Sequence, residues 1–261
     1  MTDVQRQDGS FSHQAHADSF GAVAAEYDRA RPSYPPELFD EIERLTGRPL
    51  EGADLLDVGA GTGIATRLFQ QRGARVVAVE PSAGMAAQLH RVSPEIPLVK
   101  GDGNALPCHD GTADLIAYAQ AFHWTDPDRS LPEALRVLRP GGALLLIWNV
   151  KDRTGGWLRE QEERLAAALP SYHYYGALNS VTDALAHHPF EVRTAQLPWE
   201  RRVGVDDLIT DLRSKSYFAV LTPEQREPVL AAERAALLAE FPGGLVTEPY
   251  TVDLTVAVKR G

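Results

Sequence analysis

The sequence predicts an α/β fold, a doubly wound and mostly parallel sheet with helices on both faces. Three observations lead to this prediction. Short apolar runs that suit buried strands alternate with amphipathic segments over residues 54–148. A glycine-rich loop, Gly59-Ala-Gly-Thr-Gly63, follows the first apolar run. Near the end of the chain, residues 250–258 alternate with period 2, which is typical of an antiparallel strand at or near a sheet edge.

The elements of the first half follow from prolines, glycines and apolar runs. Residues 20–30 are expected to form a short helix that Pro32, Pro35 and Pro36 stop. A second helix over 37–46 ends at Gly47, a suitable C-cap. From Asp54 onward we expect strands at 54–58, 75–80, 96–100, 114–119 and 142–148, and helices at 63–72, 82–91 and 129–138.

The second half of the chain has a different residue pattern. Residues 151–188 are predicted to be helical and are rich in aromatic residues and histidines. A strand-like piece follows at 190–203, and helices are expected at 205–214 and 222–240. We interpret 151–188 and 204–245 as insertions that form a helical cap on a single domain spanning 19–261. Residues 1–18 are polar and are expected to form a flexible tail.

Composition narrows the class of partner. The net charge of −10, without a stripe of Lys or Arg, argues against nucleic acid. The single cysteine, Cys108, excludes an internal disulfide and a cysteine-based metal site, and His13 and His16 lack a third ligand, so no metal is expected. No apolar run reaches the ~20 residues of a membrane span. We therefore expect a cytoplasmic protein without a membrane partner, and self-association into a homo-oligomer stays open.

The glycine spacing distinguishes between nucleotide-like cofactors. A dinucleotide fingerprint, G-x-G-x-x-G, would place its third glycine at position 64, which is Ile64. The loop instead reads Gly59-x-Gly61-x-Gly63 and is preceded by Asp57. The next apolar run ends at Glu80, whose carboxylate can accept hydrogen bonds from both hydroxyls of a ribose. A nucleotide-like cofactor without a pyrophosphate fits this pattern.

These residues resemble motif I, D-x-G-x-G-x-G, of the class I S-adenosylmethionine (SAM)-dependent methyltransferases, and of their small-molecule, methyltransferase type 11-like subfamily. The resemblance extends through Glu80, Gly101-Asp102-Gly103, the run that begins at Ala113, and the turn Arg136–Gly142. It implies a Rossmann-like fold, SAM as cofactor, and transfer of a methyl group to an oxygen, nitrogen or carbon atom of a small-molecule acceptor.

The resemblance also assigns roles to residues. His123, in the segment Gln120-Ala-Phe-His-Trp124 that leaves the fourth strand, is the candidate general base. Arg31 is expected to pair with the SAM carboxylate. The expected cofactor residues are Tyr27, Arg31, Asp57, Gly59, Ala60, Gly61, Thr62, Gly63, Glu80, Pro81, Met85, Asp102, Gly103, Gln120 and Phe122. The expected substrate residues are Tyr34, Trp124, Trp148, Tyr172, Tyr175 and Tyr217.

Structural roles compete with several of these assignments. Asp57 could cap the helix after the glycine loop, Asp102 could be an ordinary turn residue, and Met85 could belong to the core. His123 and Trp124 could support their loop by packing, and the aromatic residues of the cap could form its core. Two other functions also stay open: a SAM-binding protein that does not methylate, or a cyclase, and a nicotinamide (NAD)-dependent oxidoreductase.

Overall fold

The structure is a computed structural model, which describes residues 28, 31–154, 156–169, 179–219 and 221–260. The predicted tail, most of the predicted helix over 20–30, and the predicted site residues Tyr27, Tyr172 and Tyr175 lie outside the described residues. Within the described residues, no helix has both the length and the apolar character needed to cross a membrane.

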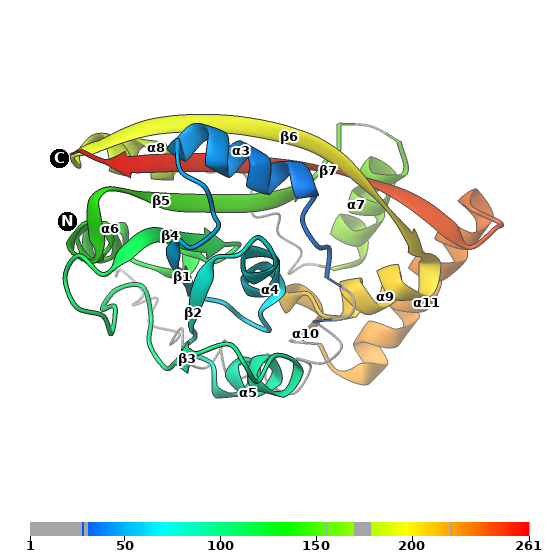
Figure 1. Cartoon of the computed structure of the whole chain (residues 1–261). Helices are drawn as coiled ribbons and strands as arrows, with labels where there is room; N and C mark the ends of the chain where they lie inside the picture. The colour runs from blue at the N-terminus through cyan, green and yellow to red at the C-terminus, as the bar shows by residue number, and fades with distance from the viewer. Residues whose placement is uncertain (1–27, 29–30, 155, 170–178, 220, 261) are drawn as a thin grey trace, which may run out of the picture.

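A seven-stranded sheet forms the centre of the molecule (Figure 1). Its order is β3 (Leu98–Val99), β2 (Arg75–Val79), β1 (Asp54–Val58), β4 (Ala113–Ala119), β5 (Leu138–Lys151), β7 (Leu245–Lys259) and β6 (Phe190–Gly204). The first five strands of this order are parallel, and β7 is antiparallel to both β5 and β6. The predicted doubly wound sheet with an antiparallel strand near its C-terminal edge is therefore confirmed.

Helices connect the strands largely where the sequence predicts them. The described helices are α3 (Pro36–Thr46), α4 (Ile64–Gln71), α5 (Ala83–Val92), α6 (Pro127–Val137), α7 (Gly156–Ala168), α8 (Asn179–Ala186), α9 (Val205–Arg213), α10 (Ser216–Ala219) and α11 (Pro223–Glu240). A short 3₁₀ turn, η1 (Phe122–Trp124), precedes α6. α6 begins two residues earlier than predicted because the Asp126 side chain caps it and Pro127 suits a first helical position.

β5 and β7 begin well before their predicted first residues, for identifiable reasons. β5 is predicted to begin at position 142 but starts at Leu138: Ala113 pairs with Leu138 and Leu115 with Ala143, so residues 139–142 leave the ladder as a bulge. β7 is predicted to begin at position 250 but starts at Leu245, since its first residues pair with the end of β6 rather than with the main sheet.

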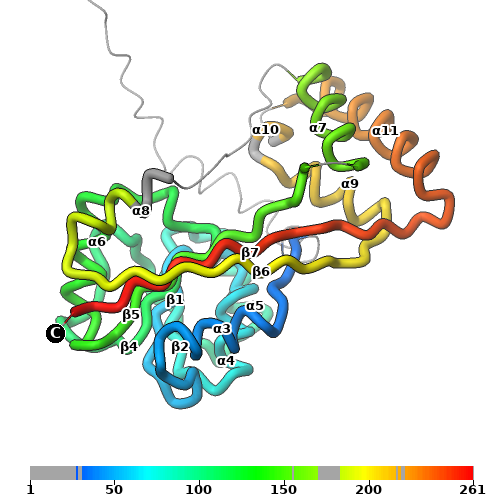
Figure 2. Tube along the Cα trace, turned by 90° about the horizontal axis from the view of Figure 1, so that it is seen from above, coloured from blue at the N-terminus to red at the C-terminus, as the bar shows by residue number. Residues whose placement is uncertain are grey.

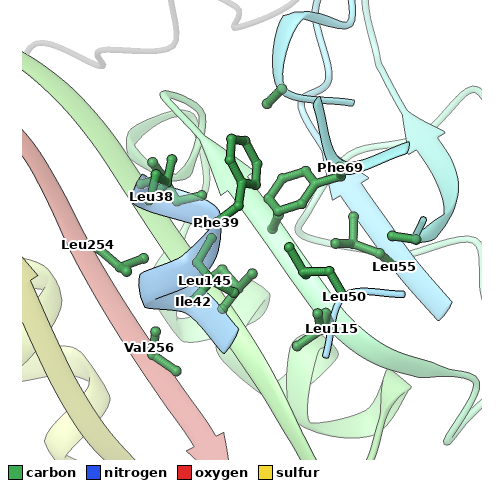
Figure 3. Close-up of a cluster of buried hydrophobic side chains, with 14 of the residues drawn as sticks. Leu38, Phe39, Ile42, Leu50, Leu55, Phe69, Leu115, Leu145, Leu254 and Val256 are labelled. Carbon is green, nitrogen blue, oxygen red and sulfur yellow. The ribbon is translucent and has the colours of Figure 1, made fainter. Parts of the chain in front are cut away.

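Each face of the sheet has its own apolar core. α3 and α4 cover one face, where Leu38, Phe39 and Ile42 meet Phe69 and the strands (Figure 3). The rings of Phe39 and Phe69 pack edge to face with their centroids 5.2 Å apart. α6 and α8 cover the opposite face, and Leu185 of α8 belongs to that second cluster. Alternate side chains of β5 enter the two cores, which explains its continuous apolar run.

The helical cap lies at one end of the molecule, carried by a two-stranded ribbon (Figure 2). β5 pairs with β7 only as far as Lys151 and Tyr250, whereas β6 and β7 remain paired to Gly204 and Leu245. The helices α7, α9, α10 and α11 pack around a third apolar cluster. The ribbon thus places the cap beyond the carboxyl end of β5, on the side of the sheet where ligands bind in open α/β folds.

Candidate functional site

The glycine loop after β1 is fixed by close backbone approach. The amides of Gly59 and Ala60 both donate to the Val79 carbonyl at the end of β2, at 2.8 and 3.2 Å. Gly59 has a φ of 70°, and a Cβ atom placed on it would lie 2.6 Å from Cβ of Ala121. Only glycine fits there. The loop after β1 therefore contacts the loop after β4, about 60 residues later in the chain.

Glu80 follows β2 and holds the glycine loop with its carboxylate. Oε2 accepts a hydrogen bond from the Gly61 amide at 2.7 Å, and Oε1 accepts one from the Ser82 amide at 2.8 Å. The side chain is buried, and this burial raises the pKa of Glu80. Because each carboxylate oxygen has a second lone pair, Glu80 can still accept hydrogen bonds from ribose hydroxyls.

Asp57, the last-but-one residue of β1, is a second buried carboxylate. The Thr66 hydroxyl donates a hydrogen bond to Oδ2 of Asp57 at 2.5 Å. Asp57 therefore contacts the Thr66 side chain in the first turn of α4 and does not cap the backbone amides of that helix. Oδ1 is buried, and no described residue donates a hydrogen bond to it. Burial, together with the nearby negative charge of Glu80, raises the pKa of Asp57 to about 6. The structure thus brings two of the predicted cofactor acids together.

The segment after β4 is strained at its first residue. Gln120 has a φ of 59°, the left-handed region, and among the described residues it is the only one besides glycine with a positive φ. Such a conformation costs about 1 kcal/mol and is most common at functional sites. Hydrogen bonds hold it in place: the Gln120 side chain donates to the Asn149 carbonyl at 2.9 Å, and its amide donates to the Ile147 carbonyl at 2.8 Å.

His123 and Trp124 lie in η1, directly after this strained residue. Both side chains are exposed, and their ring centroids lie 4.8 Å apart. Partial desolvation by the surrounding chain lowers the pKa of His123 below its usual value, so the imidazole is neutral at pH 7. Phe122 differs from this pair. It is 1% exposed and packs edge to face on Tyr118 at 5.2 Å, so its side chain is a core residue.

Six other predicted cofactor residues lie in the glycine loop, in α5 and in the loops after β2 and β3. Met85 is buried in α5, where its amide donates to the capping Ser82 hydroxyl. Asp102 is exposed and accepts a hydrogen bond from the Asn104 amide at 2.7 Å, the geometry of a turn-forming aspartate. Gly103 lies directly against the Tyr118 ring, and the predicted residues Thr62 and Gly63 are buried in the glycine loop while Pro81 is half-buried.

The predicted substrate residues separate into core and cap. Tyr34 is buried in the same apolar cluster as α3, and Trp148 is 6% exposed in the cluster on the opposite face, so both side chains contribute to the packing of the core. Tyr217 lies in the cap, half-buried against Phe218 with ring centroids 5.3 Å apart.

A buried cluster of charges at the junction of core and cap escapes prediction from the sequence. Arg31, predicted to bind the SAM carboxylate, has its Nε atom 3.6 Å from Oδ1 of Asp211 in α9. Lys151 and Lys215 approach the same carboxylate, at 3.8 and 3.2 Å. Lys151 also pairs with Glu248 of β7, as does Arg201 of β6. The only sequence signal is the spacing of Asp211, in α9, and Lys215, just after the end of α9, which lie four residues apart.

Comparison with known proteins decides the family. The chain is 36% identical over 226 residues to an uncharacterized methyltransferase of Mycobacterium tuberculosis (strain ATCC 25618 / H37Rv), covering 86% of this chain and 87% of that protein. The chain belongs to the class I SAM-dependent methyltransferases. Residues 56–146 of this methyltransferase match the methyltransferase domain family. The matched segment begins within β1 and ends within β5.

Two further similarities cover most of the methyltransferase. It is 29% identical over 265 residues to a malonyl-(acyl-carrier protein) O-methyltransferase of Pectobacterium atrosepticum, covering 95% of this chain and 97% of that protein. A solved structure from Anaeromyxobacter dehalogenans, assigned as a type II methyltransferase, shares its fold with a TM-score of 0.67 and 26% identity, covering 88% of this chain and 97% of that chain.

The cofactor of this methyltransferase is SAM, as the family implies. The residues present fit it. SAM carries an ammonium group and a positively charged sulfur, and Oδ1 of Asp57 is a buried acceptor to which no described side chain or amide donates. Among the described residues, no three His, Cys, Asp or Glu side chains are grouped to hold a metal ion.

Proposed function

We propose that this methyltransferase transfers the SAM methyl group to a small-molecule acceptor held between the loop after β4 and the helical cap. One observation carries the proposal. Two buried carboxylates, Asp57 and Glu80, lie beside the glycine loop, and the donors that they contact in the described chain are a hydroxyl and two amides, all neutral. Such a site favours a cation and disfavours the pyrophosphate of NAD.

Different residues of the chain would bind the cofactor and position the acceptor. Glu80 would bind the ribose hydroxyls while fixing Gly61, and Asp57 would accept a hydrogen bond from the ammonium group of SAM. SAM supplies a methyl group on a sulfonium, whose sulfur leaves as a neutral thioether. The loop from Gln120 to Trp124 would hold the acceptor in line with this methyl group, and orientation supplies much of the rate.

His123 is the candidate base. An acceptor hydroxyl must lose its proton as the new bond to carbon forms, and a protonated amine must lose one proton before its lone pair can attack. The ring nitrogen of a neutral imidazole can take the proton in either case. The lowered pKa of His123 keeps this ring unprotonated at neutral pH. The similarity to a malonyl-(acyl-carrier protein) O-methyltransferase favours oxygen as the acceptor atom.

A ligand series tests the cofactor half of the proposal. Full-length protein is melted alone and with SAM, with its demethylated product S-adenosylhomocysteine, or with NAD. We expect the first two ligands to raise the melting temperature, because a ligand that binds only the folded state stabilises it by mass action. A rise with NAD alone would contradict the proposal and support an oxidoreductase.

A further inference from the structure

Asn149, the third residue from the end of β5, connects three separate segments of the chain. Its Oδ1 atom accepts a hydrogen bond from the Trp199 indole of β6 at 2.9 Å, and its Nδ2 atom donates to the Ser33 carbonyl at 3.0 Å. Its backbone carbonyl accepts a hydrogen bond from the side chain of the strained Gln120 at 2.9 Å. One residue therefore contacts both the chain that precedes α3 and the loop after β4.

The chemistry of these partners allows only one orientation of the Asn149 amide. An indole N–H only donates and a backbone carbonyl only accepts, so Oδ1 must face Trp199 and Nδ2 must face Ser33. Trp199 is itself held by Tyr250, on which it stacks with ring centroids 5.3 Å apart. The two contacts thus need an acceptor and a donor on one short side chain, which is what an asparagine supplies.

Ser33 is a well-fixed partner for this amide. The next residue, Tyr34, is buried in the apolar cluster beneath α3. Pro32 and Pro35 lie on either side of this pair, and a proline ring fixes its own φ angle. The hydrogen bond from Asn149 therefore reaches a carbonyl whose position the core already determines.

The same stretch of chain also contacts the glycine loop. Five residues before Ser33, the Asp28 carboxylate accepts a hydrogen bond from Nη2 of Arg67, in α4, at 2.8 Å. The Nη1 atom of Arg67 donates to the Thr62 carbonyl in the glycine loop, also at 2.8 Å. Because five residues span at most about 18 Å, the contacts of Asp28 and Ser33 are linked through a short length of backbone.

We propose that Asn149 is a positioning residue that couples the filled cofactor site to the loop after β4 and so holds this loop in place for the acceptor. The inference rests on the proposed function, since it names a further residue of the same site. A cofactor bound to the glycine loop steadies that loop, and the contacts of Asp28 and Ser33 carry the effect to the Asn149 amide. The Asn149 carbonyl then supports Gln120, whose left-handed backbone conformation needs its surroundings to hold it.

Hydrogen exchange of the full-length protein, followed by mass spectrometry with and without S-adenosylhomocysteine, tests this coupling. In the wild type we expect the ligand to slow amide exchange over residues 120–125 by about fivefold or more, as a gain of local hydrogen bonding does. Asn149→Asp keeps an acceptor for Trp199 but turns a second oxygen toward the Ser33 carbonyl, so this slowing should be lost. The slowing over residues 59–63 and the affinity for S-adenosylhomocysteine should remain as in the wild type.

Two further variants complete the test. Gln225→Glu, at an exposed position in α11, makes the same change from amide to carboxylate, and its hydrogen bond from the Thr222 amide survives because a carboxylate also accepts. This control should exchange as the wild type does. Trp199→Phe keeps a ring on Tyr250 but removes the donor to Oδ1, so the slowing over residues 120–125 should be reduced. A wild-type pattern in Trp199→Phe would count against the inference even if Asn149→Asp does not fold.

Equal slowing over residues 120–125 in the wild type and in Asn149→Asp, whatever the absolute rates, would overturn the inference, because Asn149 would then only support the fold. Slowing over residues 59–63 without any over 120–125 in the wild type would also overturn it. Failure of the proposed function has a different signature, since S-adenosylhomocysteine would then slow exchange nowhere and would not raise the melting temperature.

Discussion

The carboxylate of Glu80 accepts a hydrogen bond from the amide of Gly61 at 2.7 Å, so the acid after β2 fixes the glycine loop after β1. This loop and the loop after β4 also touch, at Gly59 and Ala121. Three segments that lie far apart in the sequence are therefore interlocked at the carboxyl ends of adjacent strands. In the proposed function, Glu80 both shapes the loop and binds the ribose.

Substitution of Glu80 should weaken SAM binding. Glu80→Ala removes the acceptor for the Gly61 and Ser82 amides as well as the proposed ribose contact, so we expect a loss of roughly 1–3 kcal/mol, measured by calorimetric titration with SAM. Glu95→Gln, on an exposed loop, is the matched control and should bind as the wild type does. Unaltered SAM affinity in Glu80→Ala would refute the assignment.

Gly59 should tolerate substitution less well than a glycine of similar backbone conformation. Gly59→Ala places a methyl group 2.6 Å from the Ala121 side chain at a φ of 70°. Gly111 has a φ of 61° with nothing within 4 Å of the added Cβ, so Gly111→Ala measures backbone strain alone, about 1 kcal/mol. Urea unfolding should show Gly59→Ala to be the less stable variant by a further 1 kcal/mol or more, roughly the overpacking penalty. Equal losses would show that the two loops do not meet.

Asp57 should make the stability of the ligand-free protein fall between about pH 4 and pH 6. Its pKa of about 6 in the folded protein exceeds its usual value of 3.8, so the folded state binds the proton more tightly than the unfolded state does. Stability is therefore greatest while Asp57 is protonated and declines as pH rises through this window, by up to about 3 kcal/mol. Asp57→Asn has no carboxyl group to ionise at this position, so the pH-dependent loss of stability disappears. The variant should therefore gain stability relative to the wild type from pH 4 to pH 7, as measured by urea unfolding. Parallel curves for the two proteins would contradict the raised pKa.

His123 should affect the rate of transfer and not the binding of SAM. If the imidazole is the base, His123→Ala lowers kcat by roughly 10²- to 10⁴-fold and leaves the affinity for SAM unchanged. The wild-type rate should fall as pH drops through a pKa below the usual value of 6.5, because only the neutral ring accepts a proton. His90→Ala, an exposed histidine in α5, is the control. A full rate in His123→Ala would leave this residue a packing role beside Trp124.

Local patterns predict most of the sheet and the cofactor side of the site. The roles of Gly59 and Glu80 can be predicted because the strand, the glycine loop and the acid follow one another within about 30 residues. The parallel sheet then brings the ends of these strands together. The role of Trp148 does not follow from the sequence, since in a strand buried on both faces an aromatic side chain enters a core whichever way it points. Lys151, Asp211 and Glu248 come from three distant segments that only the β6–β7 ribbon brings together, and no local spacing encodes that contact.

Methyl transfer itself tests the central claim most directly. Full-length protein is incubated with SAM labelled with tritium in its methyl group and with a panel of small carboxylic acids, phosphorylated compounds, alcohols and amines, and each small-molecule product is isolated. Label released as methanol by mild base marks a carboxyl ester and separates it from methyl groups on amines, ethers or carbon. Our account predicts transfer to a small molecule of this panel, and a carboxylic acid whose oxygen accepts the methyl group would give the base-labile product. Tight binding of SAM with no transfer to any member of the panel would contradict it and favour a protein that uses the cofactor without methylating.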